Sequence, residues 1–283
     1  MFANGTVFGL LHPNLFERDK RIEDMDEAEV DISILSLTAP GVLFGSKEIS
    51  IHAARISNDY LAEAQDAHPE RLRWIGTLPM QFPDAAVVEL KRLIANGALG
   101  VLICANVDGT PLTDRSFAPL WEEANRLQTV VTIPPTLPAG ADKMTMEDYH
   151  LTAMVGFTFD TSLGVVRMIY DGFFDRYANI KFIITHSGGT VPYVTNRLDN
   201  GYRILPKCSE NISKPPSEFL NRLYYDDAMA RNDAARLCMG VCGIDHYIHG
   251  SDYPFIPYAR GLEWARDLEP SVRDAVMGNN AKE

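Results

Sequence analysis

The sequence predicts an α/β fold in which a parallel sheet closes into a distorted, TIM-like (β/α)8 barrel. Short apolar runs alternate with helix-forming segments from residue 31 to the end, a pattern typical of parallel strands joined by helical crossovers. The length of 283 residues suits one such barrel, and no low-complexity linker divides the chain. We therefore expect a single domain over residues 1–283. Residues 1–20 are irregular, so the barrel is expected to be incomplete at its N-terminus.

Apolar and β-branched runs between turn signals predict the strands. They lie at residues 31–38, 73–79, 99–104, 129–133, 181–185, 223–228 and 246–250. Residues 6–11 form a weaker candidate, which either serves as the first strand of the barrel or leaves that strand missing. Helices are predicted at residues 21–30, 49–66, 83–96, 117–127, 163–174, 191–202, 230–242 and 261–277. Residues 136–150 form a loop of a length typical of lids and binding loops.

Composition and charge exclude several classes of protein. A net charge of −12 argues against nucleic acid or an anionic membrane as a partner, because both select basic patches. No apolar run is long enough for a membrane span, and the first residues lack the basic and apolar regions of a secretory signal. The four cysteines, at positions 104, 208, 238 and 242, show no CxxC spacing and are expected to be reduced. These features together predict a cytoplasmic protein.

The strand at residues 181–185 carries the strongest functional signal. His186 and the pair Gly188 and Gly189 follow it directly. In parallel α/β proteins the chemistry lies at the carboxyl ends of the strands, and glycines allow a substrate to approach the main chain closely. His186 is therefore a candidate catalytic residue. A core histidine that makes a hydrogen bond at a strand end is an equally weighted alternative.

Polar residues follow other predicted strands as well. Thr38 comes after the strand at residues 31–38, Asp226 and Asp227 lie near the end of the strand at 223–228, and Asp252 comes after the last strand. All strand ends meet at one rim in a barrel. A histidine and an aspartate from different strands could bind a divalent metal or share acid–base work. An Asx-turn or helix cap before Pro254 is the alternative role for Asp252.

Six motifs taken together resemble the amidohydrolase-related, metal-dependent decarboxylases. This family includes aminocarboxymuconate-semialdehyde decarboxylase, γ-resorcylate decarboxylase and the 6-methylsalicylate-decarboxylase-like enzymes, and the last of these are the most similar. The motifs occur in family order from about residue 20 to the end. They are RIEDMD at 21–26, ILSLTAPG at 34–41, GTLP at 76–79, FDT at 159–161, THSGGTVPY at 185–193 and GSDYPF at 250–255.

The resemblance implies a carboxy-lyase that removes CO2 without oxidation from a hydroxybenzoate such as 6-methylsalicylate. It implies a distorted barrel with one divalent metal ion, zinc or manganese, and assembly as a homodimer or homotetramer. Asp252 and His186 would be catalytic residues and metal ligands. Arg197, Thr38 and Phe159 would bind the substrate, a small aromatic carboxylic acid.

The chain departs from the family pattern at the metal. Relatives supply two ligands from a His-x-His or Glu-x-His motif on the first strand, and no such motif occurs here. A third ligand, a histidine after strand five, is replaced by Pro134. His12, His150 or His249 could substitute, or the metal is lost. Two other functions therefore stay open: a catalytically inactive or relic barrel that binds a small acid, and a metal-independent lactone or ester hydrolase that uses His186 and Asp252.

Overall fold

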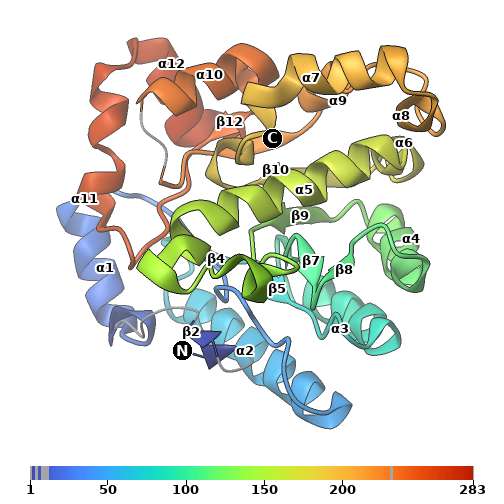
Figure 1. Ribbon diagram of the computed structural model, residues 1–283. Coiled ribbons are helices and arrows are strands. Elements are labelled where there is room, and N and C mark those ends of the chain that lie inside the picture. The colour runs from blue at the N-terminus through green and yellow to red at the C-terminus, as the bar shows by residue number, and fades with distance from the viewer. Residues whose placement is uncertain (1, 4–5, 8–12, 230–231, 283) are drawn as a thin grey trace.

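The computed structural model describes residues 2–3, 6–7, 13–229 and 232–282 (Figure 1). Its centre is a set of parallel strands that neighbour one another in chain order. The strands are β3 (Ser33–Leu35), β4 (Leu72–Trp74) with its continuation β5 (Gly76–Thr77), β6 (Gly100–Leu102), β9 (Val130–Ile133), β10 (Lys181–Ile184), β11 (Tyr224–Asp226) and β12 (Tyr247–Ile248). β3 pairs with β4, and the order from β5 onward is β5-β6-β9-β10-β11-β12. The predicted parallel α/β barrel is confirmed.

Helices cover the outside of these strands (Figure 1). They are α1 (Arg18–Glu27), α2 (Lys47–Ala67), α3 (Pro83–Ala95), α4 (Ala118–Arg126), α5 (Phe157–Tyr170), α6 (Phe173–Arg176), α7 (Val191–Ile204), α8 (Pro206–Ser209), α9 (Ser217–Leu220), α10 (Asn232–Cys242), α11 (Tyr258–Gly261) and α12 (Pro270–Asp274). Within the described residues, no helix combines the length and apolarity that a membrane span needs.

Strand β10 shows how the sequence builds the barrel wall. Phe182 and Ile184 are buried against the helices, whereas Ile183 between them is only half-buried and faces inward. Side chains of a strand alternate between its two faces, so one face packs the helical layer and the other lines the bore. β9 repeats the pattern, with Val131 and Ile133 fully buried. The core of the protein therefore lies between strands and helices.

Within the described residues, no strand lies between β12 and β3, and side chains bridge this gap instead. Tyr253 and Tyr258 stack with ring centroids 4.4 Å apart, and the guanidinium of Arg21 lies 4.5 Å from the Tyr253 ring. The Tyr258 hydroxyl makes hydrogen bonds with Arg21 (3.2 Å) and with Ser33 of β3 (3.0 Å). Tyr253 donates to Asp24 of α1 at 2.6 Å. The bond between Arg21 and Tyr258 joins α1 and α11, which lie side by side in Figure 1.

The last residues of the chain cover the open edge of β12. The main-chain N–H of His249 donates to Val276 O at 3.0 Å, and the Asn280 side chain donates to Tyr247 O and Ile244 O at 2.7 and 2.8 Å. These bonds satisfy edge groups that a neighbouring strand would otherwise pair.

Two predicted elements differ in the structure, and one further element was not predicted. Thr6–Val7 (β2) pairs antiparallel with Phe2–Ala3 (β1) rather than with the barrel, and residues 8–11 of the same predicted strand lie outside the described residues. The single predicted helix at 261–277 is broken, because Pro270 forces Glu269 into an extended conformation and α12 starts again after it. A short hairpin of β7 (Asn106–Val107) and β8 (Thr110–Pro111) was not predicted.

Candidate active site

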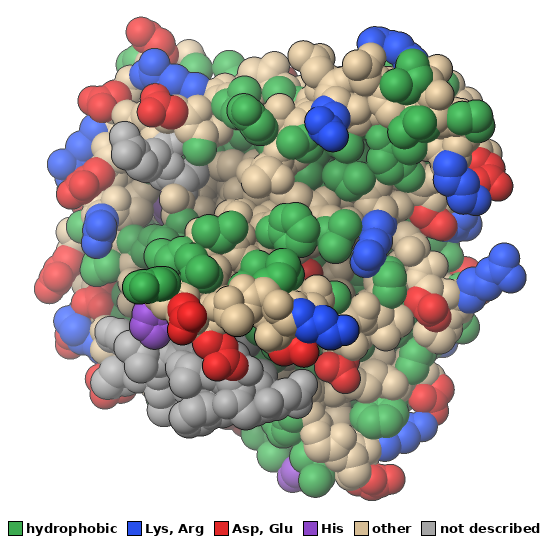
Figure 2. All heavy atoms as spheres, viewed as in Figure 1, with side chains coloured by type: hydrophobic (Ala, Val, Ile, Leu, Met, Phe, Trp, Pro, Cys, Tyr) green, Lys and Arg blue, Asp and Glu red, His purple; other side chains and the backbone are tan. Residues whose placement is uncertain are grey.

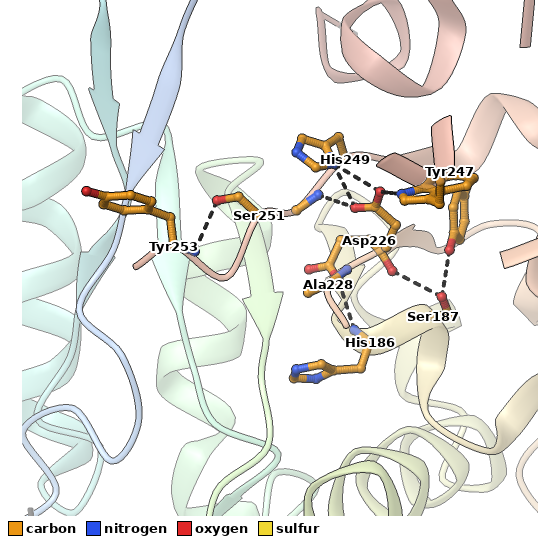
Figure 3. Close-up of polar contacts among 11 residues, drawn as sticks. His186, Ser187, Asp226, Ala228, Tyr247, His249, Ser251 and Tyr253 are labelled. Carbon is orange, nitrogen blue, oxygen red and sulfur yellow. Dashed lines mark hydrogen bonds and ion pairs between the residues drawn. The ribbon is translucent and has the colours of Figure 1, made fainter. Parts of the chain in front are cut away.

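Three acid–base side chains lie at the carboxyl ends of the neighbouring strands β10, β11 and β12. His186 follows β10, Asp226 ends β11 and Asp252 follows β12. All three line one cavity of ≈ 1780 Å³, which extends from the ends of the strands to Val130 at the start of β9. The structure therefore brings together His186 and Asp252, the two residues that the sequence marked as catalytic, and adds Asp226 (Figure 3 shows His186 and Asp226).

His186 is held by its main chain. Its N–H donates to Asp226 Oδ1 at 2.8 Å, and Figure 3 shows the imidazole turned away from that carboxylate. His186 and Ser187 have φ values of 56° and 53°, a strained region that ordinary residues occupy chiefly at functional sites. Burial lowers the pKa of His186, and the negative charge of Asp252 opposes this only in part. The imidazole is therefore neutral at neutral pH.

The Thr185 hydroxyl lies beside the ring of His186. It is 3.3 Å from Ile133 O and 3.0 Å from His186 Nδ1. When the hydroxyl donates to Ile133 O, its oxygen accepts from Nδ1–H. The lone pair then resides on Nε2, which gives the cavity a neutral base.

Asp226 has a positioning role. Its Oδ1 accepts from the N–H groups of His186 and Ala228, at 2.8 and 3.1 Å. Burial raises its pKa to about 7, the two main-chain hydrogen bonds oppose this, and the charge of neighbouring Asp227 adds to it. The same carboxylate thus orients the turn that carries His186.

Asp252 faces the cavity from a left-handed main-chain conformation, with φ of 53°. Its main-chain carbonyl accepts from Phe255 N and Ile256 N and so makes the turn. The side chain is exposed to the cavity, but the surrounding barrel wall reduces its hydration. This loss of hydration raises the pKa of Asp252 to about 6; the charge of His186 lowers it and that of Asp226 raises it. Near neutral pH a part of Asp252 is a carboxylic acid.

His249 lines the same cavity, and its ring is held by Asp227. Asp227 is almost fully buried, and its carboxylate lies 3.0 Å from His249 Nδ1. The same carboxylate accepts from Gly250 N and Trp264 Nε1, each at 2.6 Å. Burial alone would lower the pKa of His249, but the hydrogen bond and charge of Asp227 outweigh it and raise that pKa. The sequence offered His249 only as a possible substitute metal ligand and gave no sign of this partner.

The described residues do not fit the predicted metal. No three of their His, Cys, Asp and Glu side chains form a group that could hold an ion. His249 is bonded to Asp227, and His150 is exposed on a 3-10 turn at the cavity mouth. His249 Nε2 is buried without a hydrogen-bond partner among the described residues, so the substitution of His249 or His150 for a missing ligand stays a prediction. His12 lies outside the described residues.

Of the three predicted substrate-binding residues, one lines the cavity and two do not. Thr38 lines the cavity. Arg197 is exposed on α7 and is not part of the cavity wall, so its predicted contact with the substrate is not supported within this chain. Phe159 is also not part of the wall: its ring is 47% exposed on α5, close in sequence to exposed Met154 and Val155. Figure 2 shows hydrophobic side chains gathered on the face that α5 forms.

Asp160, next to Phe159, is the residue of the FDT motif that sequence reasoning missed. It is buried, and its two oxygens accept from Asn106 Nδ2 at 2.8 Å and from Thr136 N at 3.0 Å. Thr136 follows Pro134 and Pro135, which line the cavity, so Asp160 fixes the loop after β9. Burial raises its pKa to about 6, against the two hydrogen bonds and the charge of Arg167.

The raised pKa of Asp160 gives a prediction for stability. Between about pH 4 and pH 6 the folded state holds this proton more tightly than the unfolded state, so the stability that Asp160 confers falls as pH rises. The free energy of unfolding of the wild type, minus that of Asp160→Asn, should decrease by about 3 kcal/mol over this range. Urea titrations at several pH values measure it. Asp142→Asn, at an exposed site, is the control, and parallel curves for the wild type and Asp160→Asn would contradict the prediction.

A parallel barrel with acids and a histidine at the carboxyl ends of its strands defines the class of barrel enzymes. The chain belongs to the amidohydrolase family, whose model matches residues 8–283. It is 30% identical over 293 residues to 2-amino-3-carboxymuconate-6-semialdehyde decarboxylase of Dictyostelium discoideum, covering 100% of this chain and 80% of that one. It is 26% identical over 251 residues to 6-methylsalicylic acid decarboxylase of Penicillium expansum (86% and 76% covered).

A solved structure shows the same fold. It is 5-carboxyvanillate decarboxylase from Novosphingobium aromaticivorans, complexed with manganese and 4-hydroxy-3-methoxy-5-nitrobenzoic acid. The TM-score is 0.84 at 26% identity, with 95% of this chain and 79% of that chain covered. The resemblance to the decarboxylases is thus confirmed. That relative was solved with manganese, whereas no three His, Cys, Asp and Glu side chains among the described residues of this chain form a group that could hold an ion.

Proposed function

We propose that this chain is a carboxy-lyase that removes CO2 without oxidation from a hydroxybenzoate-type acid such as 6-methylsalicylate. The observation that carries the proposal is the placement of a neutral histidine and a partly protonated carboxyl group, His186 and Asp252, at the rim of one cavity. The names of the relatives support an aromatic acid as the substrate class.

His186 acts first in this scheme. Its Nε2 lone pair accepts the proton of the ring hydroxyl that lies beside the carboxylate of the substrate. The phenolate that forms pushes electron density to the ring carbon that bears the carboxylate. Asp226 holds His186 in place for this step through the bond between Oδ1 and the His186 N–H.

Asp252 completes the reaction. Its carboxylic acid donates a proton to the electron-rich ring carbon, which becomes tetrahedral. The bond from that carbon to the carboxylate then breaks, its electron pair returns to the ring, and CO2 leaves. His186 returns the proton to the hydroxyl, and Asp252 regains a proton from water. Every proton in this scheme is carried by His186, Asp252 and water.

The described residues offer no group of three metal ligands, and this favours a second candidate function, a barrel that binds a small aromatic acid without turning it over. Such a binding barrel would use the same cavity and the same side chains to recognise the acid, and it would differ from the decarboxylase only in the rate at which CO2 is released. The metal-independent hydrolase predicted as a further alternative would also use His186 and Asp252, and it differs in acting on a lactone or ester. Product analysis therefore separates the three.

The test uses purified protein with 6-methylsalicylate, with and without a chelator, and follows 3-methylphenol by chromatography. We expect product in both samples and, by plasma mass spectrometry, well below one divalent ion per chain. Tight binding without product would replace the decarboxylase by the binding barrel. Activity that the chelator removes and manganese restores would contradict the metal-free scheme, and cleavage of aryl esters alone would favour the hydrolase.

A further inference from the structure

The side chains that face the inside of the barrel are less buried than in a packed barrel. Val131 and Ile133 of β9, which face the helices, are fully buried, whereas Val130 and Thr132, which face the bore, are only half-buried. In closed barrels of this class the inward side chains pack against one another in layers and leave no bore. Here the described side chains leave their inner surfaces uncovered, so the bore is a space that can accept a ligand.

This bore continues directly from the candidate active site. One cavity of ≈ 1780 Å³ contains Asp252 and His186 at the rim and reaches Val130 at the start of β9. Ligand sites are commonly about 300–1,000 Å³, so the space exceeds what a single-ring acid fills. A substrate bound with its carboxylate at the rim would leave the deeper part empty.

The wall of the deeper part is mainly apolar and comes from one layer of the barrel. The strand register places Ile183 level with Thr132 and Tyr224, and Thr132 level with Leu102. All four side chains are half-buried and line the cavity. Ile248 of β12 is also half-buried there. Thr132 and Tyr224 add hydroxyls to this wall, and Lys181 lines the cavity level with Val130. Leu102, Ile183 and Ile248 offer the apolar surface that recognises hydrocarbon.

We propose that the site takes hydroxybenzoates whose ring carries an unbranched alkyl chain of several carbons beside the carboxylate, with the chain lying in the bore. This inference rests on the proposed decarboxylase function, because that function places the carboxylate and hydroxyl at His186 and Asp252. With the head group fixed at the rim, the ring position next to the carboxylate can direct its substituent down the bore. Each methylene that leaves water for the apolar wall should tighten binding about fourfold, which corresponds to about 0.8 kcal/mol.

The experiment compares 6-methyl-, 6-propyl-, 6-pentyl- and 6-heptylsalicylate. Dissociation constants come from calorimetry, and kcat/KM comes from the rate of phenol formation. We expect the dissociation constant to fall by more than tenfold from methyl to propyl and again from propyl to pentyl, and then to level off where the bore ends. A dissociation constant that stays constant along the series would overturn the inference.

Two blocking variants test the location. Ile183→Trp and Leu102→Trp each fill the middle of the bore, and two positions are used in case one variant does not fold. Val88→Trp adds the same kind of ring on α3, where Val88 is 59% exposed and is not part of the cavity wall. We expect the blocked proteins to bind the methyl compound normally and to lose the gain from longer chains, while Val88→Trp keeps it. A gain retained in both blocked variants would place the chain elsewhere and refute the proposal.

The two proposals fail in different ways. Binding that tightens with chain length and disappears in the blocked variants, without release of CO2 from any compound, would remove the decarboxylase function and leave the bore as an alkyl-binding site. Release of CO2 from the methyl compound without any dependence on chain length would keep the function and remove the bore.

Discussion

Replacing Asp252 by asparagine should lower kcat/KM for decarboxylation by about 10²–10⁴, the usual contribution of a positioned proton donor. The amide cannot donate a proton to the ring carbon at any useful rate. The fold should be retained, because the turn at this position is made by the main-chain carbonyl of Asp252, which accepts from Phe255 N and Ile256 N. Product formation and a thermal melt of the same sample separate loss of chemistry from loss of structure.

The pH profile adds a second test of Asp252. The donor is its protonated form, and its pKa is raised to about 6. Above that pH the fraction of donor falls about tenfold per unit, so kcat/KM of the wild type should decrease with rising pH, whereas the residual activity of Asp252→Asn should not follow this limb. Asp245→Asn, at an exposed site near the start of β12, serves as the control. If Asp252→Asn kept most of the activity, another group would be the donor.

The features that the sequence predicted correctly are local. A strand such as β10 is a short apolar run, and the residue that follows a parallel strand must lie at the rim of the barrel. This is why His186 and Asp252 could be placed on the same cavity although 66 positions separate them along the chain. Neither inference requires knowledge of which side chain touches which.

The errors came where the outcome depends on tertiary contacts or on the face of a helix. Thr158 lines the cavity and Phe159 does not, because one step along α5 turns the side chain by about 100°. Arg197 likewise lies on a solvent-exposed part of α7. The bond between Asp227 and His249 Nδ1 was also not predicted, because a contact between residues that follow two different strands leaves no local signal. The open bore is equally invisible, since apolar inward residues occur in packed and in open barrels alike.

Replacing Gly189 by alanine should destabilise the protein by about 3 kcal/mol, through overpacking and a strained main chain together. Gly189 has φ of 62°, and an added Cβ would lie 2.3 Å from Thr158 O and 2.6 Å from Ser162 Oγ. Because Thr158 O belongs to the main chain of α5, the clash cannot be relieved by rotating a side chain. The melting temperature should fall by about 5 °C.

The comparison with Gly240→Ala makes this prediction specific. Gly240 lies in α10 with nothing within 4 Å of an added Cβ, so the same substitution should stabilise the protein by about 0.5–1 kcal/mol through the better helix propensity of alanine. A loss of stability in Gly189→Ala and a gain in Gly240→Ala would show that the close contact with α5 sets the position of the His186 turn, and not a general effect of replacing glycine.

Gly189 N donates to His186 O at 3.0 Å, so Gly189→Ala should also displace His186 and lose activity in the molecules that remain folded. If Gly189→Ala matched the wild type in both stability and activity, the turn would be free to move, and the orientation assigned to His186 could not be maintained.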